Sequence, residues 1–113
     1  MAGSSKVWIV DFDGDAVIDL EDVKSKGDRK AVFNVVYKLQ QLGPDLPSPH
    51  MKSLKGEKDL FELRPKQGAV AVRVVYGRTG DRFVILAVAG RKQDFDRAVR
   101  DARSRLARHL PGG

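Results

Sequence analysis

Two neighbouring segments of alternating apolar and polar residues constrain the fold of this chain more than any other feature. Within residues 61–64, two apolar side chains alternate with Glu62 and Arg64. Within residues 70–76, apolar side chains occupy every second position, and Arg73 stands in the intervening series. A period of two residues is typical of a strand that buries one face. The pattern therefore predicts that the two segments are the strands of one hairpin.

The two arginines of this hairpin are the first candidate functional residues. If the strands pair with their apolar side chains together, Arg64 and Arg73 both stand on the open face of the sheet. A guanidinium group offers planar donors that suit an oxyanion such as phosphate. For Arg64, the alternative is an ion pair in the neighbourhood of Glu62. For Arg73 we favour phosphate binding, because it interrupts an otherwise valine-rich strand.

Turn and capping residues divide the rest of the chain into helices and strands. The predicted elements are a strand over residues 6–12, a helix over 16–24 that ends at Gly27, a helix from Asp28 to Leu42, a loop over 45–50, a short strand or loop end over 51–54, the hairpin with its turn at 65–68, a second turn over 77–81, a central strand over 82–89 and a helix after Asp94 that stops at Pro111. This order (β-α-α-β-β-β-α) indicates an α+β fold with a small antiparallel sheet. We expect two N-terminal helices and one C-terminal helix, mostly on one face, with the first strand at the sheet edge. A chain of this length fits a single domain over residues 1–113.

An acidic cluster follows the first predicted strand. Asp11 and Asp13 resemble the first motif of haloacid-dehalogenase-type phosphatases, but the later acidic pair of such enzymes is missing. An EF-hand loop would need Gly at its sixth position and Glu at its twelfth, where this chain has Ala16 and Asp22. We therefore interpret the cluster as a strand end followed by a helix with acidic residues in its first turn.

Positive charge is distributed unevenly along the chain. Residues 1–50 hold six Lys or Arg and eight Asp or Glu, whereas residues 51–113 hold fifteen and seven. The basic half contains the hairpin, which indicates a polyanionic partner on one side of the molecule. The alternative is a basic surface that only keeps the protein soluble.

Composition excludes several other classes of protein. Cysteine is absent, so the chain has no disulfide and no thiolate metal site, and its two histidines are far apart in sequence. Its apolar runs are too short to span a bilayer. Residues 1–6 have no apolar stretch of the kind that a secretory signal needs. We therefore expect a cytoplasmic protein with no membrane segment, no metal and no other cofactor.

An ordered set of short motifs resembles one known family. The motifs are Leu42-Gly43-Pro44-Asp45-Leu46 with Pro49, Leu54-Lys55-Gly56, Leu60-Phe61-Glu62-Leu63-Arg64 and Val72-Arg73-Val74-Val75-Tyr76. Together they resemble the RelE/ParE toxin superfamily, and within it the HigB, phage Gp49-like toxins of type II toxin–antitoxin modules. The resemblance covers nearly the whole chain and implies a RelE-like fold.

The resemblance implies an endoribonuclease that cuts mRNA on the translating ribosome without a metal. In such enzymes the 2′-OH of the substrate attacks the adjacent phosphate, and basic side chains assist. Matched by motif, the candidate catalytic residues are Arg64, Arg73 and Lys92. The candidate RNA-binding residues are Lys52, Lys55, Arg91 and His50.

The chain departs from the family pattern at two positions. Phe95 stands where many members have Tyr or His, and Ala89-Gly90 precedes Lys92 where they have an aromatic residue or His. His50 is then a candidate for the missing general base, and a surface histidine is the alternative.

Two other functions stay open at this point. The ParE branch of the superfamily shares the fold, inhibits DNA gyrase and needs no catalytic residues. A basic RNA-binding domain without catalysis would also fit the charge distribution. The expected partners of a toxin are a cognate antitoxin, of the small helix-turn-helix type, together with mRNA and the ribosome.

Overall fold

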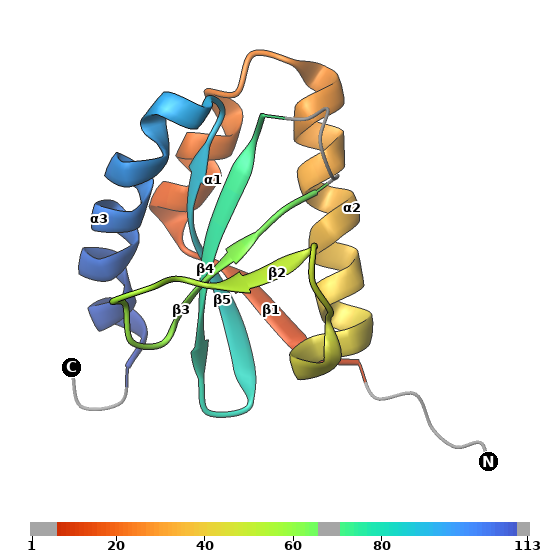
Figure 1. Ribbon diagram of the computed structural model, residues 1–113, viewed down its shortest axis with the longest axis vertical. Coiled ribbons are helices and arrows are strands. Elements are labelled where there is room, and N and C mark those ends of the chain that lie inside the picture. Colours follow the sequence, from red (N-terminus) through yellow and green to blue (C-terminus); the bar gives the residue numbers. More distant parts are fainter. Residues whose placement is uncertain (1–6, 66–70, 111–113) are drawn as a thin grey trace.

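Five strands form one mixed sheet in the computed structural model, which describes residues 7–65 and 71–110 (Figure 1). The strands are β1 (Ile9–Phe12), β2 (Met51–Ser53), β3 (Leu60–Leu63), β4 (Arg73–Thr79) and β5 (Arg82–Ala89), in the spatial order β1-β5-β4-β3-β2. β1 runs parallel to β5, and the other neighbouring strands are antiparallel. The predicted α+β class and the edge position of β1 are therefore confirmed, and β5 is an interior strand between β1 and β4. The sheet is antiparallel as predicted except for the pair of β1 with β5.

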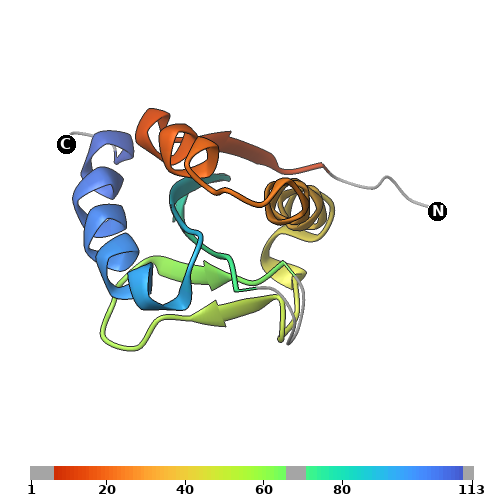
Figure 2. The ribbon, with the colours of Figure 1, turned by 90° about the horizontal axis from the view of Figure 1, so that it is seen from above.

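Helices cover both faces of this sheet. α1 (Gly14–Glu21) and α2 (Lys26–Leu42) pack on one face, and α3 (Phe95–Leu106) packs on the other. Single 3-10 turns lie at Gly43–Asp45 (η1), Lys92–Asp94 (η2) and Ala107–His109 (η3). Figure 2 shows the sheet curved around α2, with α3 outside the curve. Two of the three helices thus share one face, as expected, and α3 covers the other, so that β5 is buried on both of its faces.

Alternation along β4 supplies a core on each side of the sheet. Val74 and Tyr76 are buried in the cluster that includes α1 and α2. Val75, between them, is buried with Ala98 and Ala102 of α3. Burial of a large apolar side chain contributes about 1.5–3 kcal/mol, so both helix layers are tied to the hairpin that carries the candidate site.

Both N-terminal helices begin earlier than the sequence predicts. α1 starts directly after Asp13, whose side chain accepts a hydrogen bond from the Asp15 backbone N–H at 2.9 Å. α2 starts after Ser25, whose hydroxyl accepts from the Asp28 backbone N–H at 3.2 Å. The acidic cluster is thus a helix start, as interpreted. Asp28 is not the cap of α2, and Gly27 lies inside the first turn of α2 because Ser25 caps the helix first.

Gly77 lies within β4, not in a turn. A Cβ atom at this position would lie 3.0 Å from Leu106 Cδ1 and 3.1 Å from Leu86 Cδ1, so a side chain would disturb the packing of α3 on β5. The turn is shorter than predicted, since β4 continues to Thr79 and β5 starts at Arg82.

The C-terminal helix starts directly after Asp94, as predicted, and ends earlier than predicted, at Leu106. The Asp94 side chain makes no capping hydrogen bond to the helix. The predicted stop at Pro111 lies outside the described residues, and so does the predicted hairpin turn at 65–68 apart from Pro65. Within the described ranges, none of the helices combines the length and the apolar character that a bilayer crossing requires.

Candidate functional site

Glu62 on β3 joins the two arginines that the sequence predicts to bind phosphate. Its Oε2 atom accepts a hydrogen bond from Nε of Arg64 at 2.9 Å and lies 3.2 Å from Nε of Arg73. Arg73 is held at a second point, because its Nη1 donates to the Val72 carbonyl oxygen at 2.9 Å. The Glu62 side chain is only 6% exposed, whereas those of Arg64 and Arg73 are 35% and 21% exposed. A buried carboxylate thus contacts two partly exposed guanidinium groups.

The strand register explains why these three side chains meet. Glu62 and Arg64 are two residues apart, so their side chains leave the chain on the same face. Glu62 lies opposite Val75 of β4, which places Glu62, Val75 and, two residues before Val75, Arg73 on one face. Val75 packs under α3. The sequence predicted an open face for the two arginines, but α3 packs on this face of the sheet. They lie on the α3 face, where β4 begins.

Lys52 adds a third positive charge to the same face. It lies directly opposite Glu62 in the pairing of β2 with β3, and it is exposed. Opposite residues of an antiparallel pair project to one face. Lys52, Arg64 and Arg73 therefore outnumber the single carboxylate, and we call these four residues the Glu62 cluster. Its excess of positive charge suits a phosphate group.

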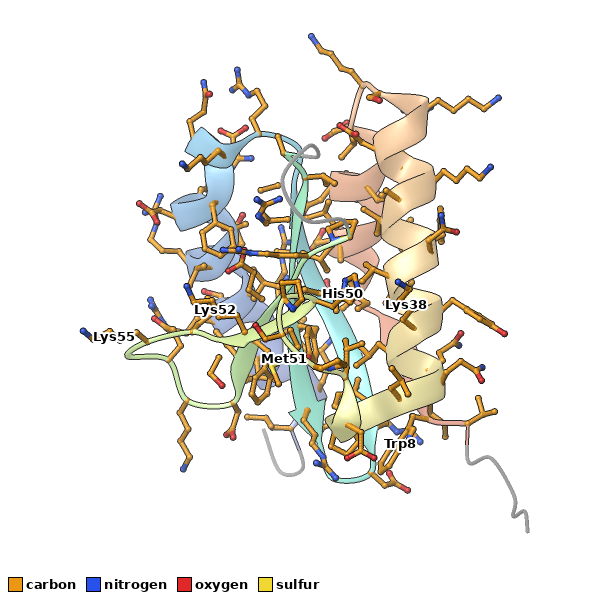
Figure 3. The ribbon with its side chains drawn as sticks, turned by 45° about the vertical axis from the view of Figure 1, so that its right-hand side comes forward. Trp8, Lys38, His50, Met51, Lys52 and Lys55 are labelled. Carbon is orange, nitrogen blue, oxygen red and sulfur yellow. The ribbon has the colours of Figure 1, made fainter. Side chains whose placement is uncertain are left out.

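His50 contacts the end of β3. Its Nδ1 lies 3.1 Å from the Arg64 carbonyl oxygen, and its own carbonyl oxygen accepts from the Arg64 backbone N–H at 2.8 Å. Its Nε2 lies 3.4 Å from Nζ of Lys38 on α2, and Figure 3 shows the two side chains together. Because a carbonyl oxygen can only accept, Nδ1 carries the proton and Nε2 is the acceptor. The fold thus brings His50 next to Arg64.

The two remaining predicted lysines, Lys55 and Lys92, lie at opposite ends of the sheet. Lys55 follows β2 and points outward from the turn that leads to β3 (Figure 3), whereas Arg64 follows β3 at the other end of that strand. Lys92 is exposed in η2, three residues after Ala89, the residue opposite Arg73. Lys92 therefore lies at the end of the sheet where β4 begins, and Lys55 does not.

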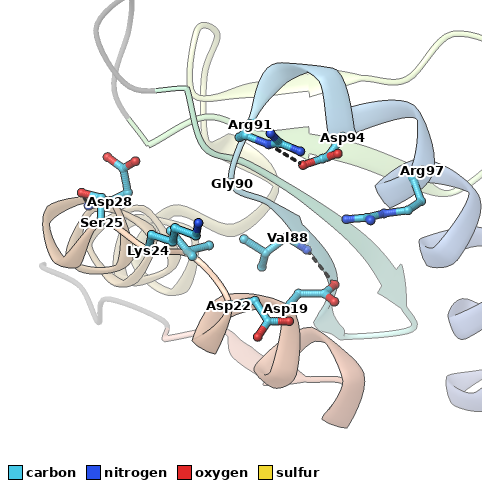
Figure 4. A pocket seen from close by; sticks show the side chains of 11 residues that line it. Asp19, Asp22, Lys24, Ser25, Asp28, Val88, Gly90, Arg91, Asp94 and Arg97 are labelled. Atoms are coloured by element: carbon cyan, nitrogen blue, oxygen red, sulfur yellow. Dashed lines mark hydrogen bonds and ion pairs between the residues drawn. The ribbon is translucent and has the colours of Figure 1, made fainter.

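Arg91 lines a separate cleft of about 480 Å³ between the α1–α2 connection and the start of α3 (Figure 4). Its Nε donates to Oδ2 of Asp94 at 3.1 Å. The charged residues that line the cleft are Asp19, Asp22, Asp28, Asp94, Lys24, Arg91 and Arg97. Carboxylates outnumber cations there, so the cleft suits a polyanion less well than the Glu62 cluster does. Nowhere in residues 7–65 and 71–110 do three or more His, Cys, Asp or Glu side chains gather so that they could hold a metal ion.

A second buried carboxylate, Asp13, lies outside the predicted site. Its Oδ2 is 2.7 Å from Nε2 of His109, and its Oδ1 is 3.3 Å from Nη1 of Arg108. Burial alone would raise the pKa of Asp13, but the hydrogen bonds from His109 and the Asp15 backbone, with the charge of Arg108, lower this pKa below its usual 3.8. We call these residues the Asp13 cluster. It ties η3 to the start of α1.

Sequence reasoning does not assign Glu62 to the site. One available signal is its spacing of two residues from Arg64, which places both side chains on one face. The contacts with Arg73 and the proximity of Lys52 depend on the strand register instead. Register follows from turn geometry and from the pairing of distant strands, which the alternation of one strand does not encode.

A family model matches most of the chain. The model of the family described as "Phage derived protein Gp49-like (DUF891)" matches residues 20–109, which include every residue of the Glu62 cluster. A search of curated proteins found no match at a significant level.

Solved structures of RelE proteins are similar to this chain in fold. A chain of the RelB–RelE antitoxin–toxin complex from Methanococcus jannaschii is 21% identical, with 77% of this chain and 96% of that chain covered and a TM-score of 0.62. A free double-arginine mutant of the Escherichia coli toxin RelE is 16% identical, with 88% and 97% covered and a TM-score of 0.64. The same mutant in complex with a peptide of the antitoxin RelB is 19% identical, with 81% and 94% covered and a TM-score of 0.54. The fold is therefore RelE-like.

Proposed function

The chain belongs to the phage-derived Gp49-like family, and from this premise we propose that it is the toxin of a type II toxin–antitoxin module that cleaves mRNA on the ribosome. The observation that carries the proposal is the Glu62 cluster, in which Arg64 and Arg73 share one carboxylate on a face that also holds Lys52. Two partly exposed guanidinium groups held side by side are suited to binding one phosphate group.

The proposed reaction is a transesterification within the RNA strand. The 2′-OH attacks the adjacent phosphorus, the bond from phosphorus to the 5′ oxygen breaks, and the leaving oxygen takes up a proton. The products carry a 2′,3′-cyclic phosphate, or a 3′-phosphate after hydrolysis, on one fragment and a 5′-hydroxyl on the other. Charge builds up on the phosphoryl oxygens in the transition state, and donors fixed in advance stabilise it.

The side chains divide these roles as follows. Arg64 and Arg73 stabilise the phosphoryl oxygens, because an arginine stays protonated and cannot act as a base at neutral pH. Lys92 is a phosphate clamp or the acid for the leaving oxygen. Lys52, Lys55, Arg91 and His50 contribute to RNA binding. His50 is the candidate base for the 2′-OH only if its ring turns away from Lys38, because its acceptor nitrogen Nε2 faces that lysine of α2, on the opposite side of the sheet from the Glu62 cluster.

The proposed partners follow from the same premise. Two of the similar RelE structures are complexes with antitoxin RelB or a peptide of it, which supports a cognate antitoxin for this chain as well. We expect a small helix-turn-helix antitoxin encoded next to the toxin, and action on cytoplasmic ribosomes.

The test is cleavage of a defined mRNA on programmed ribosomes by the purified chain. We expect cleavage of the all-ribose message and no cleavage of a message with a single 2′-deoxy nucleotide at the scissile position. We also expect activity to survive EDTA at concentrations that leave the ribosomes intact, because Arg and Lys hold the phosphate charge that a metal would otherwise hold.

Three other outcomes would contradict the proposal. Full activity on the 2′-deoxy message would exclude attack by the 2′-OH. Damaged DNA with intact mRNA in growth-arrested cells would instead support a ParE-like gyrase inhibitor. Binding of RNA without cleavage or growth arrest would support a non-catalytic RNA-binding domain.

A further inference from the structure

We propose that Glu62 is a positioning residue, which holds the guanidinium groups of Arg64 and Arg73 in the orientation that cleavage requires without touching the RNA itself. This inference rests on the proposed function and deepens it, since it assigns a role to a residue of the same cluster.

The first argument is the geometry of the contacts. Both arginines approach the same oxygen, Oε2, and both do so through Nε, at 2.9 Å for Arg64 and 3.2 Å for Arg73. Nε is the donor nearest to the side-chain stem, so a contact there fixes the plane of the guanidinium group and leaves its far end directed away from the carboxylate. One buried atom therefore contacts both planar donor groups, and the Val72 carbonyl oxygen holds Arg73 at a second point.

The second argument is burial. Glu62 is 5% exposed as a whole residue, so it is poorly placed to contact a bound RNA directly. An unpaired carboxylate at such a position would be strongly unfavourable, and the two arginines compensate it. A negative charge beside a phosphate-binding site weakens the attraction for RNA, so the carboxylate opposes binding while it orders the arginines.

The Glu62 carboxylate thus weakens RNA binding and favours cleavage. These opposite effects separate a positioning role from a structural one. Replacing Glu62 with Gln removes the negative charge and keeps the size of the side chain. Binding of RNA should then be unchanged or tighter, because the face becomes more positive. Cleavage should fall, because the neutral amide oxygen of Gln holds two guanidinium groups more weakly than a carboxylate does, and small misplacements of reacting groups can lower a rate by about a hundredfold. A purely structural role would lower binding and cleavage together, in proportion to the fraction of protein that is folded.

The experiment measures the dissociation constant for mRNA-programmed ribosomes and the single-turnover cleavage rate at saturation for the wild-type chain, Glu62→Gln, Glu62→Asp and Glu57→Gln. Glu57 is a matched control, since it is also a partly buried glutamate that pairs with an arginine, Arg103, and it lies outside the cluster. The aspartate variant keeps the charge and shortens the side chain, so it tests position alone. Thermal unfolding of each variant gives the folded fraction at the assay temperature.

We expect Glu62→Gln to bind at least as tightly as the wild type and to cleave about a hundredfold more slowly. We expect Glu62→Asp to lose cleavage with little change in binding, and Glu57→Gln to change neither. Cleavage by both Glu62 variants at the wild-type rate, or parallel losses of binding and cleavage that match their folded fractions, would overturn the positioning role and leave the proposed function standing. If the wild-type chain itself does not cleave, the proposed function fails, and the positioning role fails with it.

Discussion

The two buried carboxylates of the described chain, Glu62 and Asp13, lie in similar surroundings but connect different parts of the molecule. Glu62 is 5% exposed and contacts two arginines, and Asp13 is 2% exposed and contacts Arg108 and His109. The partners of Glu62 belong to the same hairpin: Arg64 follows β3 directly, two residues away, and Arg73 begins the adjacent strand β4. The partners of Asp13 are 95 and 96 residues away, in the turn that follows α3.

This difference separates a contribution to stability from a contribution to function. Asp13 caps α1 and connects two segments that no strand pairing joins, so it contributes to holding the fold together. Glu62 connects strands that backbone hydrogen bonds already pair, so its cluster is less necessary for the fold. A buried charge that the fold does not require is a candidate for a functional role.

The largest expected effect that sharpens this comparison is the loss of cleavage in Arg73→Ala. Removing one preorganised donor to a transition-state oxyanion typically lowers a rate by about a hundredfold to a thousandfold. Growth assays at equal expression, ribosome cleavage assays and thermal melts should show relief of toxicity in a protein that still folds. Arg103→Ala is the control, because Arg103 pairs with Glu57 away from the cluster. Undiminished toxicity of Arg73→Ala would remove Arg73 from the site.

The next effect is a loss of stability in Asp13→Ala. The substitution removes the cap of α1 and the contacts with Arg108 and His109, and we expect it to lower the free energy of unfolding by about 2–3 kcal/mol. Urea denaturation measures the change. Asp11→Ala is the control, because the Asp11 side chain is 51% exposed and its ion pair with Arg82 lies at the surface, so the expected cost is below about 1 kcal/mol. Equal costs for the two variants would refute the stabilising role of Asp13.

A smaller effect concerns pH. Burial opposes ionisation of Asp13, but its hydrogen bonds and the charge of Arg108 prevail, so its folded-state pKa lies below the usual 3.8. A depressed pKa gives stability that is complete above the unfolded-state value and is lost as the pH falls through the folded-state value. Thermal melts from about pH 6 to about pH 2 should therefore show a steeper acid loss for the wild type than for Asp13→Asn. An identical fall of the melting temperature at low pH for the two proteins would contradict this assignment.

The smallest effect compares two lysines. Lys52 lies opposite Glu62, whereas Lys55 lies at the other end of β3. If Lys52 contacts one RNA phosphate, Lys52→Ala should reduce the slope of log affinity against log salt by about 0.7. Lys55→Ala should reduce that slope less, because Lys55 lies away from the Glu62 cluster, and salt titrations of binding to a short single-stranded RNA measure both. A slope for Lys52→Ala equal to that of the wild type would place Lys52 outside the RNA contact. Affinity of the wild-type chain that does not change with salt would contradict a phosphate-binding face altogether.

Local pattern accounts for the parts of the fold that sequence predicts well. The alternation of residues 60–76 gives the hairpin, and the apolar run from Phe83 to Ala89 gives the buried strand β5. The start of α2 differs from the prediction, because Ser25 and Asp28 can both cap a helix and a single sequence does not decide between them. Gly77 looks like a turn residue, but it is needed where β4 passes close to Leu106 of α3.

The sequence by itself determined which side chains are available for function and on which side of its own strand each one lies, because a strand has a period of two residues. It therefore identified Arg64 and Arg73 as candidates and carried the family resemblance. Only the tertiary structure decided that Glu62 lies between them, that Lys52 shares their face and that α3 covers the rest of it. The physical reason is that these contacts depend on the register between strands and on how helices pack on the sheet. Both arise from interactions between distant segments that no local pattern encodes.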